Sequence, residues 1–123
     1  MNSEKLKKLY LTLQETALWE MANLKKSRTG LPVMIYISGN KSSRGPRIKF
    51  FDSYSDTLGD NYDLLIPLTV SKDPQIPIEH ELNIKKQDLD KVKQWVIKNY
   101  DLLLALYNEE IDEIEAALKQ QKI

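Results

Sequence analysis

The spacing of apolar residues along the chain first predicts a long helix over about residues 3–27. Apolar side chains recur there every third or fourth position, which is the period of a helix with one buried side. The segment TGLP at residues 29–32 predicts the end of this helix, because glycine allows a positive φ and proline cannot continue the hydrogen-bond ladder. The stripe comprises Leu6, Leu9, Tyr10, Leu13, Ala17, Met21 and Leu24.

A second apolar ridge on the same predicted helix consists of Leu11, Leu18 and Ala22, with Trp19 further round. Two interpretations stay open. Either both ridges pack within the domain, or the second ridge is an interaction surface for a partner or a second copy, because a small sheet does not easily cover both.

Residues 33–84 are predicted to form a three- to four-stranded, mainly antiparallel sheet. Residues 33–38 (VMIYIS) favour a strand buried on both faces, and residues 47–51 (RIKFF) favour its hairpin partner. Residues 64–70 predict a further strand, placed at an edge or at a bulge because Pro67 lacks a backbone donor. Residues 81–84 predict a short extra strand.

The remaining residues predict C-terminal helices over about 86–107 and 109–120, divided at Asn108. The expected fold is therefore α+β in a single domain over residues 1–123, with a long N-terminal helix, the sheet, and helices packed on one sheet face. Trp95 lies at the margin of the helical stripe and is a candidate interface anchor.

Charge is uneven along a chain whose formal net charge is zero. Residues 1–51 contain ten basic and three acidic residues, whereas residues 52–81 contain one basic and seven acidic residues. The zero balance argues against a uniformly basic nucleic-acid binder, and the lack of cysteine excludes disulfides and thiol chemistry. No signal-like or membrane-spanning apolar run is visible, so a cytoplasmic location without a membrane partner is expected.

Catalytic motifs such as GxSxG, the GxxxxGK[ST] phosphate loop and HExxH do not occur in the sequence. We therefore assign no catalytic, cofactor-binding or metal-binding residue and expect no cofactor. The aspartates of residues 52–63 could bind a divalent cation or form a solvated loop, and the solvated loop is favoured. His80 lies between Glu79 and Glu81, but neighbours on an extended segment point to opposite sides, which favours a structural or solvated histidine.

A candidate basic face lies on the predicted hairpin and consists of Lys41, Arg44, Arg47 and Lys49. Arg47 and Lys49 share one face because strand side chains alternate. This face has three interpretations: an ordinary solvated surface, a surface for an acidic protein partner, or a surface that contacts nucleic-acid phosphates.

The segments MANL at 21–24, TGLP at 29–32, IYIS at 35–38 and RIK at 47–49 resemble a family of uncharacterised small bacterial proteins. The similarity continues through WVIKN at 95–99 and EID at 110–112. The resemblance implies an α+β unit of helix, small sheet and C-terminal helices, and it supplies no catalytic residues. The resemblance also implies an association with phages or other mobile elements.

These observations favour a non-enzymatic protein-binding or regulatory module that associates with itself, as a homodimer, or with a protein related to a phage or mobile element. A nucleic-acid-binding protein that uses the basic hairpin is the first alternative. A metal-dependent enzyme that uses the aspartates of residues 52–63 with Glu79 or His80 is the second and least favoured alternative.

Overall fold

A computed structural model describes residues 21–39 and 44–123 and shows an α+β fold with one four-stranded antiparallel sheet. The strand order is β1-β2-β3-β4, so every strand pairs with its neighbour in sequence. The strands are β1 (Met21–Leu24), β2 (Ile35–Ser38), β3 (Arg47–Phe51) and β4 (Leu65–Thr69). Short helical turns, α2 (Lys26–Thr29) and η1 (Tyr62–Leu64), lie in the connections.

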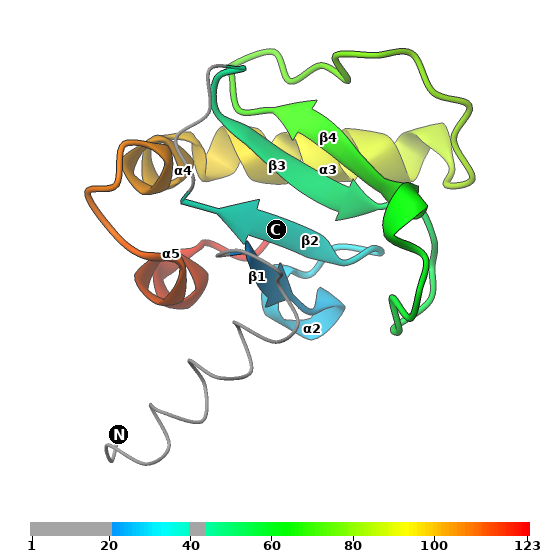
Figure 1. Cartoon of the computed structure of the whole chain (residues 1–123), viewed down its shortest axis with the longest axis horizontal. Helices are drawn as coiled ribbons and strands as arrows, with labels where there is room; N and C mark the ends of the chain where they lie inside the picture. The colour runs from blue at the N-terminus through cyan, green and yellow to red at the C-terminus, as the bar shows by residue number, and fades with distance from the viewer. Residues whose placement is uncertain (1–20, 40–43) are drawn as a thin grey trace.

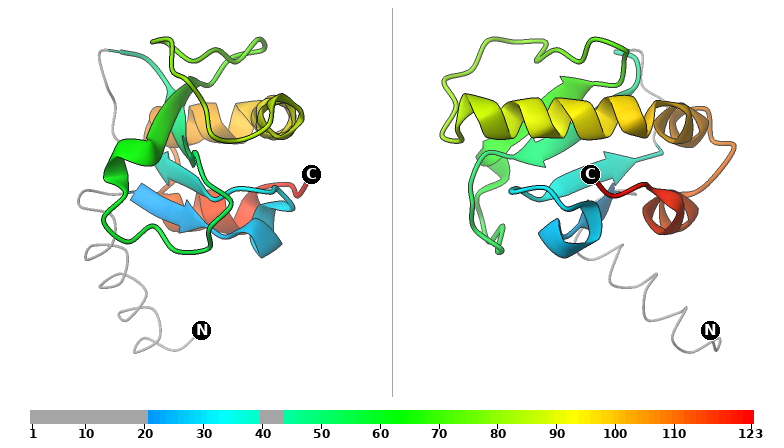
Figure 2. Two further views of the ribbon diagram at one scale, coloured as in Figure 1. Left: turned by 90° about the vertical axis from the view of Figure 1, so that its right-hand side faces the viewer. Right: turned by 180° about the vertical axis from the view of Figure 1, so that it is seen from behind.

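Three helices follow the sheet: α3 (Lys86–Lys98), α4 (Tyr100–Tyr107) and α5 (Glu113–Lys119). Helix α3 crosses one face of the sheet, behind the strands in Figure 1 and in front of them in the right panel of Figure 2. Helix α5 packs beside β1. The opposite face carries no described helix, and we call it the open face. None of the helices in the described ranges is both long and apolar enough to cross a bilayer.

The main core lies between the sheet and α3. Register places Leu24, Ile35, Phe50 and Ile66 in one row across the four strands. All four side chains are buried, together with Val92, Trp95 and Val96 of α3. Burying such a row removes apolar surface from water and specifies which face of each strand turns inward.

The predicted N-terminal helix is wrong where the structure describes it. Residues 21–24 form the edge strand β1, in which Ala22 and Leu24 pair with Ile37 and Ile35. The apolar positions in residues 21–24 fit the period of a helix and also the alternation of a strand. Residues 21–24 form a strand because they pair with the backbone N–H and C=O groups of β2. Residues 1–20 of the predicted helix lie outside the described residues.

The sequence predicted that a helix ends at residues 29–32, and the short helix α2 does end there. Helix α2 ends at Thr29, and Gly30 follows with a φ of 79°, while its N–H donates to the Lys26 carbonyl. This left-handed conformation is the one in which glycine has no steric cost.

Of the two placements predicted for the Pro67 strand, an edge or a bulge, the structure shows the edge, since β4 ends the sheet. Asp52 donates its N–H to the Leu64 carbonyl, and Val70 donates to the Pro46 carbonyl. In an antiparallel ladder the bonded pairs alternate, so Pro67 falls opposite Lys49 at a pair that exchanges no hydrogen bonds. The missing N–H of Pro67 therefore removes nothing from the ladder.

The predicted helix over 86–107 is divided at Asn99, which the sequence did not indicate. The Asn99 amide nitrogen donates to the Trp95 and Gln121 carbonyls, and its oxygen accepts from the Gln121 N–H. These contacts with a distant segment compete with the helical ladder. The break at Asn108 is confirmed, but α5 begins later than predicted, with Asp112 as its N-cap.

Gly39 is tightly enclosed, so replacement by alanine is expected to destabilise the protein by about 1–2 kcal/mol in urea unfolding. A Cβ there would lie 2.8 Å from Glu113 Oε1 and 3.2 Å from Leu106 Cδ1. The Glu113 carboxylate also accepts the Gly39 N–H at 3.0 Å, so it cannot move without losing that bond. In a Glu113→Ala background the same substitution should have a smaller effect. An unchanged unfolding midpoint for Gly39→Ala would contradict this packing.

Candidate functional site

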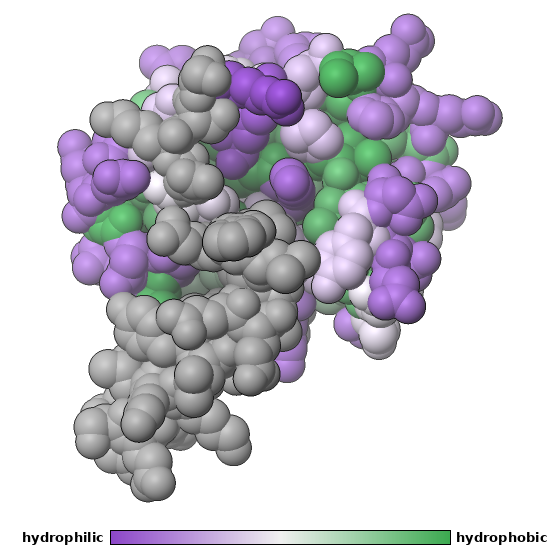
Figure 3. All heavy atoms as spheres, viewed as in Figure 1, coloured by the Kyte–Doolittle hydropathy of each residue, from purple (hydrophilic) through white to green (hydrophobic). Residues whose placement is uncertain are grey.

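The open face brings together the two cations that the sequence predicted to share a side. Along β3, Arg47 is half-buried and Lys49 is exposed, while Ile48 and Phe50 are buried on the other face. Register places Lys49 in a row with Asn23, Tyr36 and Pro67, and it places Arg47 opposite Thr69. Figure 3 views the molecule from this side, and its coloured part shows hydrophilic side chains beside hydrophobic ones.

The charged side chains that the four strands place on the open face are of one sign. The four strands contain no aspartate or glutamate. Within the described ranges, the ion pairs join Lys26 to Asp56, Lys91 to Asp88 and Lys119 to Glu115, and none includes Arg47 or Lys49. An ordinary solvated surface usually mixes both signs, so this uncompensated pair is the distinctive feature of the face.

Arg47 also has an unsatisfied donor. Its Nε atom is buried and makes no hydrogen bond within the part of the chain that the structure describes. A buried N–H without an acceptor costs about 1–3 kcal/mol. An oxygen anion from outside could pair only with the part of the half-buried guanidinium that remains exposed.

One end of the open face is apolar and covered. Met34, Tyr36 and Phe51 are buried there against Leu58, Leu64 and Leu65 of the β3–β4 connection and β4. Burial and, secondarily, the nearby Tyr62 raise the pKa of Tyr36 above its usual value, so its hydroxyl stays neutral. The open face therefore runs from a covered apolar end to an exposed cationic end.

The acidic connection over 52–63 is held by hydrogen bonds and an ion pair within the chain. The buried Asp52 carboxylate accepts the N–H groups of Asn83 and Ile84 at 2.9–3.0 Å. Asp56 pairs with Lys26 at 3.1 Å, and Asp60 and Asp63 are exposed. No group of three metal-ligating side chains occurs within residues 21–39 and 44–123.

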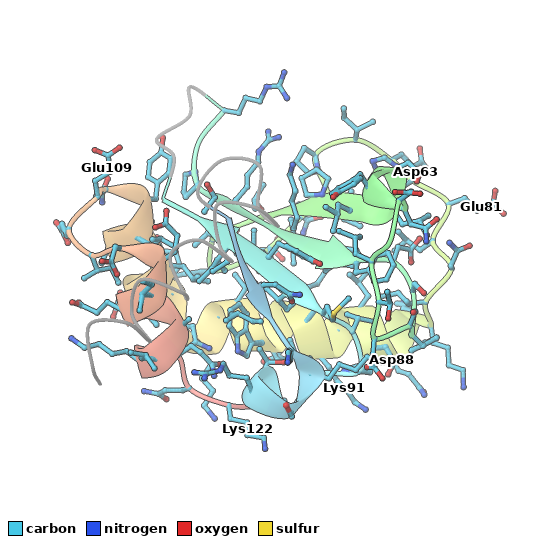
Figure 4. The ribbon with its side chains drawn as sticks, turned by 60° about the horizontal axis from the view of Figure 1, so that its bottom comes forward. Asp63, Glu81, Asp88, Lys91, Glu109 and Lys122 are labelled. Atoms are coloured by element: carbon cyan, nitrogen blue, oxygen red, sulfur yellow. The ribbon has the colours of Figure 1, made fainter. Side chains whose placement is uncertain are left out.

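Tyr54 ties the same connection to the start of α3. Its hydroxyl donates to Asp88 at 2.5 Å and accepts the Lys85 N–H at 2.9 Å. The hydrogen bond to Asp88 is the main reason why the pKa of Tyr54 is raised above its usual value. Asp88 also lies 3.7 Å from Lys91, one turn further along α3 in Figure 4. These interactions explain the two buried carboxylates as structural groups.

Two residues of the predicted interaction surface are not on the surface. Trp95 is fully buried, and its Nε1 donates to Gln120 Oε1 at 2.9 Å. Ala22 is also buried, because strand geometry turns it toward the core. The other members of that surface, Leu11, Leu18 and Trp19, lie outside the described residues.

The remaining candidate residues from the sequence belong to the basic hairpin and to the connection between β4 and α3. Arg44 is exposed beside β3, and Lys41 lies outside the described residues. His80, Glu79 and Glu81 are exposed in the connection between β4 and α3, and residues 81–84 form no strand. Sequence reasoning missed Tyr36 as a member of the cationic face, although its alternation with Ile35 and Ile37 would have placed it there.

Comparison with known proteins adds nothing to the description of the fold and of the open face. No family model, curated protein or solved structure matches the chain. The resemblance carried by the MANL and TGLP segments stays a prediction, and function has to be argued from the site alone.

Proposed function

We propose that the chain is a non-catalytic protein-binding module whose open face receives an acidic segment of a partner protein. The observation that carries this proposal is the pair Arg47 and Lys49, which lie two residues apart on one strand without a counter-ion in the described residues. A carboxylate from a partner would supply the missing charge and an acceptor for the guanidinium of Arg47.

The alternative of a nucleic-acid surface has less support. Binding to a nucleic-acid backbone usually neutralises many phosphates, whereas the described part of this face offers two cations, with Arg44 beyond them. The connection that covers the apolar end also exposes Asp60 and Asp63. These carboxylates would repel a long polyanion but would not obstruct a short acidic peptide segment.

Replacement of Arg47 and Lys49 by glutamine is expected to weaken binding to a fluorescent polyglutamate peptide at least about tenfold at low salt, because hydrogen bonds to charged groups contribute about 1.5–3 kcal/mol each. Lys86→Gln with Lys93→Gln is the matched control, since it removes the same charge from α3, on the other side of the sheet. Fluorescence anisotropy measures both variants.

Two results of that titration would contradict the proposal. One is an equal loss of affinity in the α3 control variant, which would indicate a nonspecific effect of net charge. The other is tighter binding to single-stranded or duplex DNA than to the peptide, with a salt dependence that Arg47→Gln and Lys49→Gln reduce, which would favour the nucleic-acid alternative.

A further inference from the structure

The connection between β4 and α3, residues 70–85, projects an apolar side chain between acidic ones. Ile78 is 70% exposed, the largest exposed fraction among the large hydrophobic side chains of the described residues. Glu79 and Glu81 follow it and are exposed. Figure 4 shows Glu81 directed away from the body of the molecule. We call residues 77–81 the acidic loop.

Both ends of this connection are held, so the acidic loop protrudes from fixed points. At its start, Thr69 donates its N–H to the Gln75 carbonyl at 2.9 Å, and the Gln75 N–H donates back to Thr69 Oγ1. At its end, the N–H groups of Asn83 and Ile84 bind the Asp52 carboxylate. Fixed ends reduce the conformational entropy that the loop would lose when it binds.

The acidic loop and the open face are complementary in charge and in apolar content. The loop offers two carboxylates beside an isoleucine, and the face offers Arg47 and Lys49 beside the half-buried Pro67. We propose that the acidic loop of a second copy of this chain docks on the open face. This inference rests on the proposed function and names the partner.

The acidic loop does not lie over the open face of its own chain. The connection passes from the edge strand β4 toward the side of the sheet that α3 covers (Figure 2, left panel). A two-fold axis in the plane of the sheet, beside β4, turns the α3 side of one copy toward the open side of the other. The acidic loop of each copy then reaches the open face of the other copy, and the assembly closes as a dimer.

A charge exchange tests this arrangement. The face variant carries Arg47→Glu and Lys49→Glu, and the loop variant carries Glu79→Lys and Glu81→Lys. In sedimentation equilibrium at low salt, each variant alone is expected to dimerise at least about tenfold more weakly than the original chain, because like charges then meet. An equimolar mixture is expected to dimerise again, because each face meets a loop of opposite charge. Ile78→Ser should weaken the original dimer at low and at high salt.

A monomeric original chain at every concentration, or a mixture that stays monomeric, would overturn the second copy as partner. Circular dichroism of each variant shows whether it remains folded, and Ile78→Ser, which changes no charge, provides an independent measurement. The polyglutamate titration separates this failure from failure of the proposed function. A monomeric chain whose peptide binding still depends on Arg47 and Lys49 keeps its binding role and loses only this partner.

Discussion

Replacement of Trp95 by alanine is expected to lower the free energy of unfolding by about 3–5 kcal/mol, the largest effect of any single substitution considered. The indole is fully buried between α3 and the sheet, so its removal leaves a cavity in the main core. Its Nε1 donates to Gln120, whose amide nitrogen donates to the Arg28 carbonyl at 2.8 Å. Urea unfolding followed by far-ultraviolet circular dichroism measures the change.

Trp95→Phe and Gln120→Ala separate the two contributions of Trp95. The first keeps most of the apolar volume, and the second removes only the acceptor, so each is expected to cost about 1–2 kcal/mol. If Trp95→Ala does not fold, these two variants still measure the effect. A stability for Trp95→Phe and Trp95→Ala equal to that of the original chain would contradict the burial of this side chain.

Asp52→Ala is expected to lower the free energy of unfolding by about 3 kcal/mol, because it leaves the Asn83 and Ile84 N–H groups without their acceptor. Asp52 is 2% exposed, so water does not readily replace its carboxylate. Loss of this acceptor also releases the end of the β4–α3 connection from the β3–β4 connection. Thermal and urea unfolding measure the loss.

Asp60→Ala is the matched control for Asp52, since Asp60 is an exposed aspartate of the same connection. Its removal is expected to change the stability by less than about 0.5 kcal/mol. Equal effects of the two substitutions would mean that the connection acts through its net charge and not through the hydrogen bonds of Asp52.

The sheet was predictable where the alternation of apolar and charged residues within a single strand defines the two faces of that strand. The alternation of Ile48 and Phe50 with Arg47 and Lys49 defined both faces of β3, and this is also the part of the candidate site that the sequence predicted correctly. Apolar side chains that alternate with cations are buried on a single face in an extended backbone, so local pattern and tertiary structure agree there.

The features that were missed depend on residues far apart in the sequence. The segment MANL becomes a strand because β2 offers it backbone partners, and Asn99 divides a helix because residue 121 binds its side chain. Trp95 was placed at a helix margin because the angle around α3 does not reveal that the C-terminal segment covers it. Periodicity within one segment contains no information about such partners.

The contacts of residues 120–123 have a consequence for the order of folding. Every strand pair joins neighbours in sequence, so the sheet can assemble from local encounters, which are fast. By contrast, the Ile123 N–H donates to the Thr29 carbonyl at 2.8 Å, and Gln120 and Gln121 bind Arg28 and Asn99. The Thr29–Ile123 and Arg28–Gln120 bonds join residues more than 90 positions apart, so they form after the sheet, and the kinetic barrier to unfolding depends on them more than the rate of folding does.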